Sequence, residues 1–166
     1  MLKVIGIHHV TLICSDMDRT AKFYTEILGL KLVKQTVNFD DPKAKHFYFG
    51  DEKGKTGTLI TFFEYPDWRG GRIGVGITHH IAFMVDNEKE QLEFRRKLQE
   101  RGISVTEQID RKYFKSIYFN DPDGVILEIA TAGPGFAVDE EEKHLGEKVF
   151  GPEKQPVRKG GYIRAK

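Results

Sequence analysis

The sequence predicts an α+β fold made of two βαβββ modules, and an internal repeat is the main reason. An offset of 71 residues places the segment around His9 on the segment around His80. After each of these segments the chain reads as one helix followed by three strands. Near the end of each copy, Thr61 and Glu128 occupy equivalent places. Two copies with the same order of elements indicate two copies of one supersecondary unit.

The first module is predicted to span residues 1–64. Its expected elements are a strand at 4–14, a helix from Ser15 to Gly29, and strands at 30–39, 46–49 and 58–64. Ser15 is the expected N-cap, with Asp18 as acidic support, and Gly29 supplies the C-terminal stop. Apolar side chains recur at helical spacing and are assigned to the core: Met17, Ala21, Tyr24, Ile27 and Leu28.

Residues 65–76 contain Pro66 and several glycines and are predicted to form a flexible linker, in which Trp68 is either a lid over a pocket or an exposed contact. The second module is predicted at 77–132. Its expected elements are a strand at 77–85, a helix at 87–101 with Leu92, Phe94 and Leu98 inward, and strands at 104–109, 114–120 and 124–130. Residues 133–166 are expected to form an extended or mobile C-terminal tail.

His9, His80 and Glu128 are the candidate metal ligands. A carboxylate in an apolar strand is costly to bury unless it is paired or bound to a metal. Two imidazoles and one carboxylate can occupy one face of a metal ion and leave positions open, as in non-haem Fe(II) oxygenases. Taken singly, the histidines could be satisfied core residues and Glu128 could extend to solvent. The repeat favours the interpretation as metal ligands, because it places a histidine, His9 or His80, at the same strand position of both copies.

Glu64 is a second carboxylate near the end of the first module, but the repeat places Thr61, not Glu64, opposite Glu128. Glu64 also differs from Thr61 in strand parity, so the two side chains leave opposite faces. The fourth position of a symmetric site would therefore hold Thr61, which is a poor ligand for a divalent cation. The expected site has three protein ligands.

Bulk properties exclude several classes of function. The 166 residues are 39% hydrophobic, and the formal net charge of +1 provides no basic field for nucleic acid. No apolar run in the sequence is long enough to cross a membrane. The first residues lack the regions of a signal peptide. Cys14 is the one cysteine, so no internal disulfide is possible and a reducing cytoplasmic location is expected. Cys14 lies in an apolar strand and is interpreted as an inert core residue.

With these features in hand, residues 1–132 resemble the vicinal oxygen chelate (glyoxalase/bleomycin resistance/extradiol dioxygenase) superfamily, and within it the ring-cleaving dioxygenases of the hydroquinone and catechol type. The resemblance is carried by four stretches, at residues 8–12, 29–42, 121–131 and 133–136. It implies paired βαβββ modules that form an open, barrel-like metal-binding cleft. It implies metal ligands at His9, His80 and Glu128. It also implies supporting catalytic roles for five residues: His8, Thr11, His79, Arg111 and Tyr118.

The activity implied by this resemblance is opening of a small aromatic diol by O₂ with Fe(II), or with Mn(II) or another divalent metal. Tyr118 precedes Glu128 on the neighbouring strand and could donate a hydrogen bond to the reacting ring. Arg111 could hold a phenolate or carboxylate. The alternatives are that Tyr118 is a rim aromatic and Arg111 a solvated cation.

Other functions of the same fold stay open. They are a glyoxalase-I-like metal-dependent isomerase or lyase, a thiol transferase, and a metal-free small-molecule-binding module. An isomerase of this type commonly has four protein ligands, so Thr61 favours the dioxygenase. The dioxygenases that the chain resembles usually contain four modules, so a homodimer with active sites shared between chains is expected. The alternative closes both modules of one chain around one metal.

Overall fold

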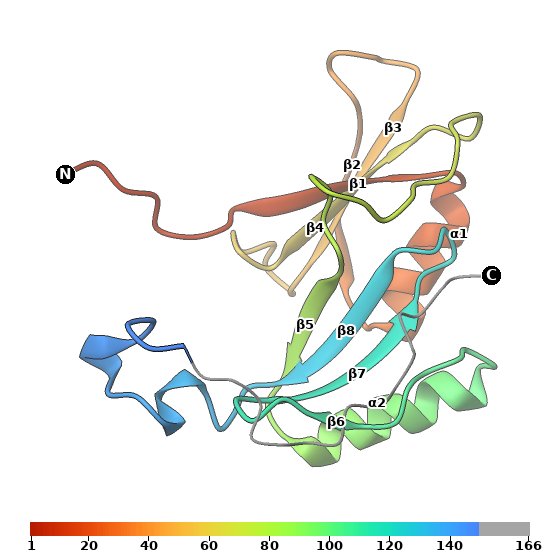
Figure 1. Cartoon of the computed structure of the whole chain (residues 1–166). Helices are drawn as coiled ribbons and strands as arrows, with labels where there is room; N and C mark the ends of the chain where they lie inside the picture. Colours follow the sequence, from red (N-terminus) through yellow and green to blue (C-terminus); the bar gives the residue numbers. More distant parts are fainter. Residues whose placement is uncertain (150–166) are drawn as a thin grey trace.

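Two four-stranded sheets organise the computed structural model, which describes residues 1–149 of the chain (Figure 1). The first module contains β1 (His9–Cys14), α1 (Met17–Lys22), the π-helical turn η1 (Phe23–Ile27), β2 (Lys31–Val37), β3 (Lys45–Gly50) and β4 (Leu59–Glu64). The second contains β5 (Ile81–Val85), α2 (Glu88–Glu100), β6 (Ile109–Asp110), β7 (Lys115–Asn120) and β8 (Ile126–Thr131). The predicted α+β class with two βαβββ modules is confirmed.

The two sheets have equivalent strand orders, β1-β4-β3-β2 and β5-β8-β7-β6. In each sheet the first strand of the module pairs in parallel with the last. Thr61 lies opposite Thr11 in the first sheet, and Glu128 lies opposite Ala82 in the second. Since Thr11 and Ala82 are separated by the same offset as His9 and His80, the register confirms that Thr61 and Glu128 are equivalent positions.

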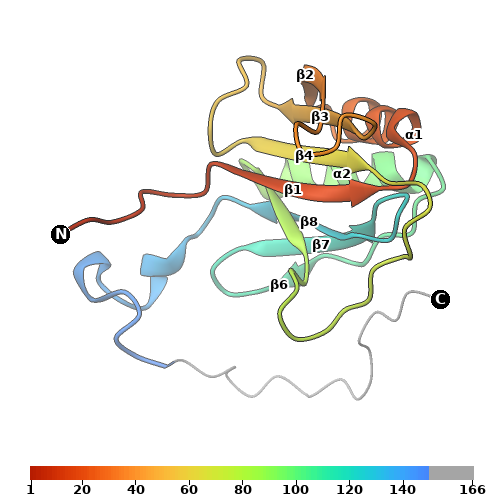
Figure 2. The same ribbon diagram turned by 90° about the horizontal axis from the view of Figure 1, so that it is seen from above.

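Both leading strands begin later than the sequence predicts. The expected strand at 4–14 begins at His9, and the one at 77–85 begins at Ile81, so His80 immediately precedes β5 instead of lying in it. The reason is the partner: β4 begins at Leu59, opposite His9, and β8 begins at Ile126, immediately before the partner of Ile81. Residues before His9 have no strand to pair with and extend away from both sheets (Figure 2).

Each helix is capped, but not always by the predicted residue. Asp16, not Ser15, caps α1 by accepting a hydrogen bond from the Arg19 amide, whereas Asn87 caps α2. The inward face of α2 contains Leu98 as expected, but Leu92 is 47% exposed and Gln91 is fully buried in its place. The Gln91 side-chain amide donates to the carbonyl oxygens of Lys115 and Ile129, both at 2.7 Å, and so joins α2 to β7 and β8.

The last strands and the tail also differ from expectation. The strand expected at 104–109 is reduced to β6 at Ile109–Asp110. Residues 133–149 contain two short 3₁₀ turns, at Phe136–Val138 and Glu142–His144, and the Phe136 ring packs beside the Tyr113 ring with centroids 5.4 Å apart. The beginning of the predicted tail therefore covers the β6–β7 turn. Residues 150–166 of that prediction lie outside the described residues.

Contacts between α1 and the β7–β8 turn join the two modules. Asp123 accepts hydrogen bonds from the backbone and side chain of Ser15 and pairs with Arg19 at 2.6 Å. The Tyr24 hydroxyl donates to Asp121 at 3.2 Å. One buried hydrophobic cluster includes residues of both modules. The sheets do not close into a barrel, which agrees with the predicted open cleft, and no helix among residues 1–149 is long and apolar enough to cross a membrane.

Candidate functional site

Equivalent faces of the two sheets carry the polar side chains predicted to form the site. In the second module, Tyr118 lies opposite Glu128, and in the first module Tyr48 lies opposite Thr61. Two residues earlier, β7 has Ser116 where β3 has His46. Because side chains alternate along a strand, each set shares one face of its sheet. The chain therefore contains two related polar faces with different chemistry.

On the second face, His80 and Glu128 contact each other directly. His80 Nε2 lies 2.9 Å from Glu128 Oε2, and Ser116 Oγ donates a hydrogen bond to Glu128 Oε1. Glu128 is only 2% exposed, so both carboxylate oxygens are buried and both are used. A buried carboxylate held in this way has a fixed orientation, with Oε2 aimed at the imidazole.

Each candidate ligand histidine is paired with the histidine before it. The Nδ1 atoms of His8 and His9 are 3.0 Å apart, and those of His79 and His80 are 2.9 Å apart. In both pairs the rings are 5.1 Å apart and nearly perpendicular. When Nδ1 of His9 or His80 carries the proton and donates it to the neighbour, Nε2 presents a lone pair. His8 and His79 thus orient the candidate ligands, which is how supporting residues act around metal sites.

Tyr118 and Arg111 lie together beside His80. The Tyr118 ring meets the His80 ring edge-on, with centroids 5.7 Å apart. Arg111 Nη2 donates a hydrogen bond of 3.2 Å to the Tyr118 hydroxyl, and its guanidinium lies 5.5 Å from the centre of the same ring. Arg111 therefore holds Tyr118 in place, a contact that the sequence interpretation did not include.

A hydrogen-bonded chain occupies the first face. The Tyr48 hydroxyl lies 3.2 Å from His46 Nδ1, His46 Nε2 lies 3.0 Å from Thr61 Oγ1, and Thr61 donates to Thr11 Oγ1 at 2.9 Å. Burial lowers the pKa of His46, and the nearby His9 lowers it further, so the neutral imidazole is favoured. Thr61 is fully buried and committed to this chain.

His46 and Ser116 are the two site residues that sequence reasoning missed. His46 contacts Thr61, and Ser116 contacts Glu128. Thr61 and Glu128 are the equivalent positions of the two faces. The signal that could have revealed them is the repeat itself, because both precede the paired tyrosines Tyr48 and Tyr118 by two residues. A histidine and a serine are too dissimilar for the repeat to be noticed from residue identity.

His9 does not join His80 and Glu128 within one chain. No three histidine, cysteine, aspartate or glutamate side chains among residues 1–149 lie close enough together to hold a metal ion. His9 and Thr11 are exposed on the first face, and His80 and Glu128 meet on the second. The three-ligand assignment remains a prediction that needs the first face to approach a second face.

Two other residues that the sequence raised lie outside these faces. Glu64 accepts a hydrogen bond of 2.7 Å from the Met17 amide and pairs with Lys45 at 3.1 Å, so it supports the start of α1. Cys14 is buried, and burial is the main cause that raises the pKa of its thiol to about 11. A thiol with that pKa stays protonated near neutral pH, as expected of core filler.

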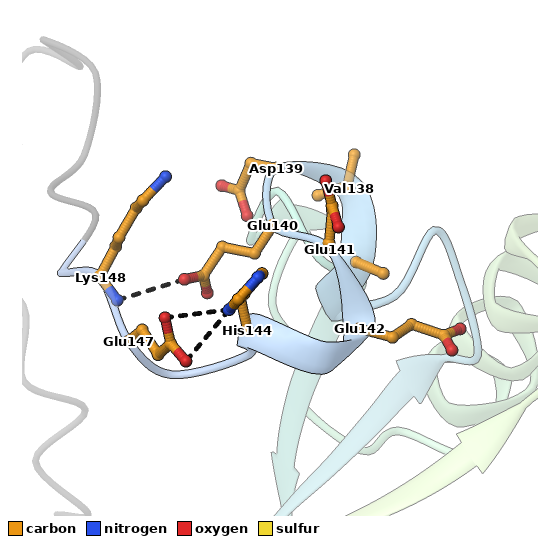
Figure 3. Close-up of a pocket in the computed structure, with 9 residues that line it drawn as sticks. Val138, Asp139, Glu140, Glu141, Glu142, His144, Glu147 and Lys148 are labelled. Carbon is orange, nitrogen blue, oxygen red and sulfur yellow. Dashed lines mark hydrogen bonds and ion pairs between the residues drawn. The ribbon is translucent and has the colours of Figure 1, made fainter.

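Residues 137–148 form a hollow of about 740 Å³. Most of the side chains that line it are acidic (Figure 3). The carboxylate of Glu140 accepts hydrogen bonds from the Gly146 and Lys148 amides. The carboxylate of Glu147 contacts His144 at 3.1 Å. These contacts show that the acidic groups brace the tail, and none of the predicted site residues lines this hollow.

Comparison with known proteins places this geometry in a family. The profile of the Glyoxalase/Bleomycin resistance protein/Dioxygenase superfamily matches residues 6–129. A Bacillus subtilis (strain 168) protein named "Putative ring-cleaving dioxygenase MhqO" is 42% identical over 138 residues, which cover 81% of this chain and 43% of that protein. The chlorohydroquinone/hydroquinone 1,2-dioxygenase of Sphingobium indicum is 30% identical over 130 residues, covering 76% of this chain and 40% of the enzyme.

A crystal structure titled as a putative dioxygenase from Bacillus subtilis is similar, with a TM-score of 0.74 and 40% identity, over 81% of this chain and 43% of that one. The chain thus spans less than half the length of the dioxygenase relatives that it matches. A relative of similar length is the metallothiol transferase FosB of Shouchella clausii, which is 34% identical over 77% of this chain and 81% of that protein.

Proposed function

The chain belongs to the glyoxalase/bleomycin resistance protein/dioxygenase superfamily, and we propose that it is a metal-dependent ring-cleaving dioxygenase. In this proposal Fe(II) and O₂ open a hydroquinone- or catechol-like ring. Two relatives named as ring-cleaving or hydroquinone dioxygenases support it. The observation that carries the proposal is the contact of His80 with the buried carboxylate Glu128.

The donor set fits a divalent first-row metal. His80 Nε2 and Glu128 Oε2 are 2.9 Å apart. Two neighbouring ligands, each about 2.1 Å from an octahedral ion, would lie about 3.0 Å apart. In the proposed site, His9, His80 and Glu128 would hold the ion, and two imidazoles with one carboxylate suit Fe(II). When bound, the metal would supply Lewis acidity towards the diol and positions for substrate and O₂.

The remaining residues of the second face would prepare the substrate and move protons. Ser116 donates a hydrogen bond to the Glu128 carboxylate, and His79 contacts Nδ1 of His80 and so orients its ring. The Tyr118 hydroxyl, held by Arg111, would donate a hydrogen bond to an oxygen of the ring as negative charge develops there. Two groups of side chains would therefore act on the substrate in different ways. His9, His80 and Glu128 would hold the metal, and Tyr118 would be the proton donor.

We also propose that two copies of the chain share the site. His9 of one chain would join His80 and Glu128 of its partner, so that a dimer has two sites and four modules. The exposed position of His9, which does not join His80 and Glu128 within residues 1–149 of one chain, supports this arrangement. β1 and β5 are also edge strands, and exposed apolar side chains near them, including Ile7 and Met84, would be buried by a partner.

Metal content and oxygen uptake test the proposed function. Protein purified without air should contain a stoichiometric first-row metal and consume O₂ with hydroquinones or catechols. Glu128→Gln should abolish uptake and reduce metal content, because it removes the one anionic ligand. Thr61→Ala, which changes the equivalent position of the first face, should leave metal content nearly unchanged. Metal lost from the Thr61 variant would refute the three-ligand site, and turnover of thiol adducts without oxygen uptake would indicate the isomerase or transferase.

Tyr118→Phe should retain the metal and slow ring opening by about 10²-fold, the usual worth of a positioned proton donor. Tyr113→Phe is the matched control, since its hydroxyl bonds Asp139 at 3.1 Å in the tail and not the candidate site. Steady-state oxygen uptake with metal quantified in each sample distinguishes the two variants. Equal rates for Tyr118→Phe and the unchanged protein would remove Tyr118 from the mechanism.

A further inference from the structure

A cleft of about 590 Å³ lies between β1, the connection at residues 65–76, and the beginnings of β5 and β8. Its lining includes His79 and His80 as well as Trp68, Arg69 and Arg72. Its walls are mostly apolar, and the sequence interpretation left the role of Trp68 open. The composition of this cleft indicates what it binds.

Trp68 is held in a defined place. Its indole stacks on the Tyr65 ring, with centroids 4.3 Å apart and planes 13° apart, and its amide donates to the Tyr65 carbonyl. Tyr65 is itself fixed, because its amide donates to the Cys14 carbonyl and its hydroxyl accepts a hydrogen bond from Asn38. A stacked pair anchored to β1 presents an aromatic surface to a planar ligand.

The charge of the cleft is positive. Arg69 and Arg72 line it, and neither forms an ion pair with any residue in the part of the chain that the structure describes. The one carboxylate that lines the cleft is Asp123, and its charge is taken by Arg19 at 2.6 Å. Two guanidinium groups without an internal anion beside an aromatic surface fit a carboxylate attached to a ring.

We propose that this cleft binds a small aromatic carboxylic acid, with the ring against Trp68 and the carboxylate on Arg69 and Arg72. If the proposed dioxygenase function is correct, on which this second step rests, the substrate is a dihydroxylated ring with an acidic substituent. The hydroxyl groups would face His80, and the acid would lie on Arg69 and Arg72. The binding step depends only on the cleft and not on the metal.

The single tryptophan of the chain makes the binding step measurable, since all tryptophan fluorescence comes from Trp68. Metal-free protein is titrated with benzoate and with benzamide, which have the same shape but differ in charge. Benzoate should change the emission saturably, and benzamide should bind about tenfold more weakly, since a charge-assisted hydrogen bond is worth about that factor. Arg69→Gln/Arg72→Gln should remove the preference and leave benzamide binding unchanged.

Arg96→Gln/Arg101→Gln is the matched control, because it removes the same charge from residues that do not line the cleft. Equal affinities for benzoate and benzamide, or an equal effect of both double variants, would overturn the proposal. Oxygen uptake with 2,5-dihydroxybenzoate and hydroquinone then tests the second step in Fe(II)-loaded protein. Benzoate binding without uptake of oxygen would refute the dioxygenase and retain the cleft, whereas uptake that prefers neutral hydroquinone would refute the acidic substrate.

Discussion

Mixing an inactive His9→Ala protein with an inactive Glu128→Gln protein should restore ring-cleaving activity. In the shared arrangement, a heterodimer of these chains has one site with both defects and one intact site. Random exchange makes about half of the dimers heterodimers, so activity should return to about a quarter of the unmodified value. The measurement is oxygen uptake before and after subunit exchange, with metal supplied equally to all samples.

The control for this experiment uses two defects on the same face. His80→Ala and Glu128→Gln both damage the second module, so every site in their heterodimer contains one damaged second face. That mixture should stay inactive under the shared arrangement, while the first mixture recovers. If both mixtures stay inactive although exchange is shown by mass, the metal belongs to one chain and the shared site is wrong.

The structure gives a physical reason to expect recovery. His80 and Glu128 are already in contact at 2.9 Å, whereas His9 lies on an exposed face that does not reach them. Ser15, just before α1, and Tyr24, just after it, donate hydrogen bonds to Asp123 and Asp121 of the β7–β8 turn. Moving the first face onto the second within one chain would break those buried and partly buried contacts. A second copy can supply His9 without breaking them.

The repeat was sufficient to predict the fold and the equivalence of Thr61 and Glu128. Both depend on strand register, and a shared register follows from one supersecondary unit used twice. The family expected from four short stretches is also confirmed by the match over residues 6–129. A pattern that recurs along the chain is a property of sequence alone, so it can be read without coordinates.

Details that depend on partners from distant residues could not be predicted. The segments before His9 and Ile81 are apolar enough to be strands, but β4 begins only at Leu59, opposite His9, and β8 extends only one residue beyond the partner of Ile81. Gln91 is buried in place of Leu92 because two carbonyl oxygens on β7 and β8 meet its amide. Helical periodicity predicts that a polar residue faces solvent, because it does not include the distant carbonyl oxygens of Lys115 and Ile129 that accept these hydrogen bonds.

The same limit applies to the candidate site. Roles for His8, His79 and Tyr118 were expected from the resemblance. In the structure His8 lies beside His9, and both His79 and Tyr118 lie beside His80. Arg111 was expected to meet a substrate, and it contacts Tyr118. His46 and Ser116 occupy equivalent places in the repeat, but their residue types differ too much for the repeat to identify them. Their roles become clear only from the residues that they contact on the neighbouring strand, Thr61 and Glu128.

That cross-sheet pairing leads to the last prediction, the double change Thr61→Glu/His46→Ser. It builds into the first face the carboxylate and serine pair that Glu128 and Ser116 form on the second. The register of β3 and β4 matches that of β7 and β8, so the introduced carboxylate should be aimed as Glu128 is. His46 must be replaced with it, because the imidazole now lies 3.0 Å from Thr61 Oγ1.

In the assembled site this variant should have four protein ligands, two from each face. A second carboxylate should bind the divalent metal at least about tenfold more tightly, since a charged ligand replaces an open position. Oxygen uptake should fall by about 10²-fold or more although the metal is retained, because ring cleavage needs positions for both diol and O₂. Thr61→Gln/His46→Ser is the matched control, with the same shape and no charge, and it should not tighten the metal. Competition with a chromophoric chelator measures the affinity, and equal metal affinity in the two double variants would show that Thr61 does not occupy the fourth position of the site.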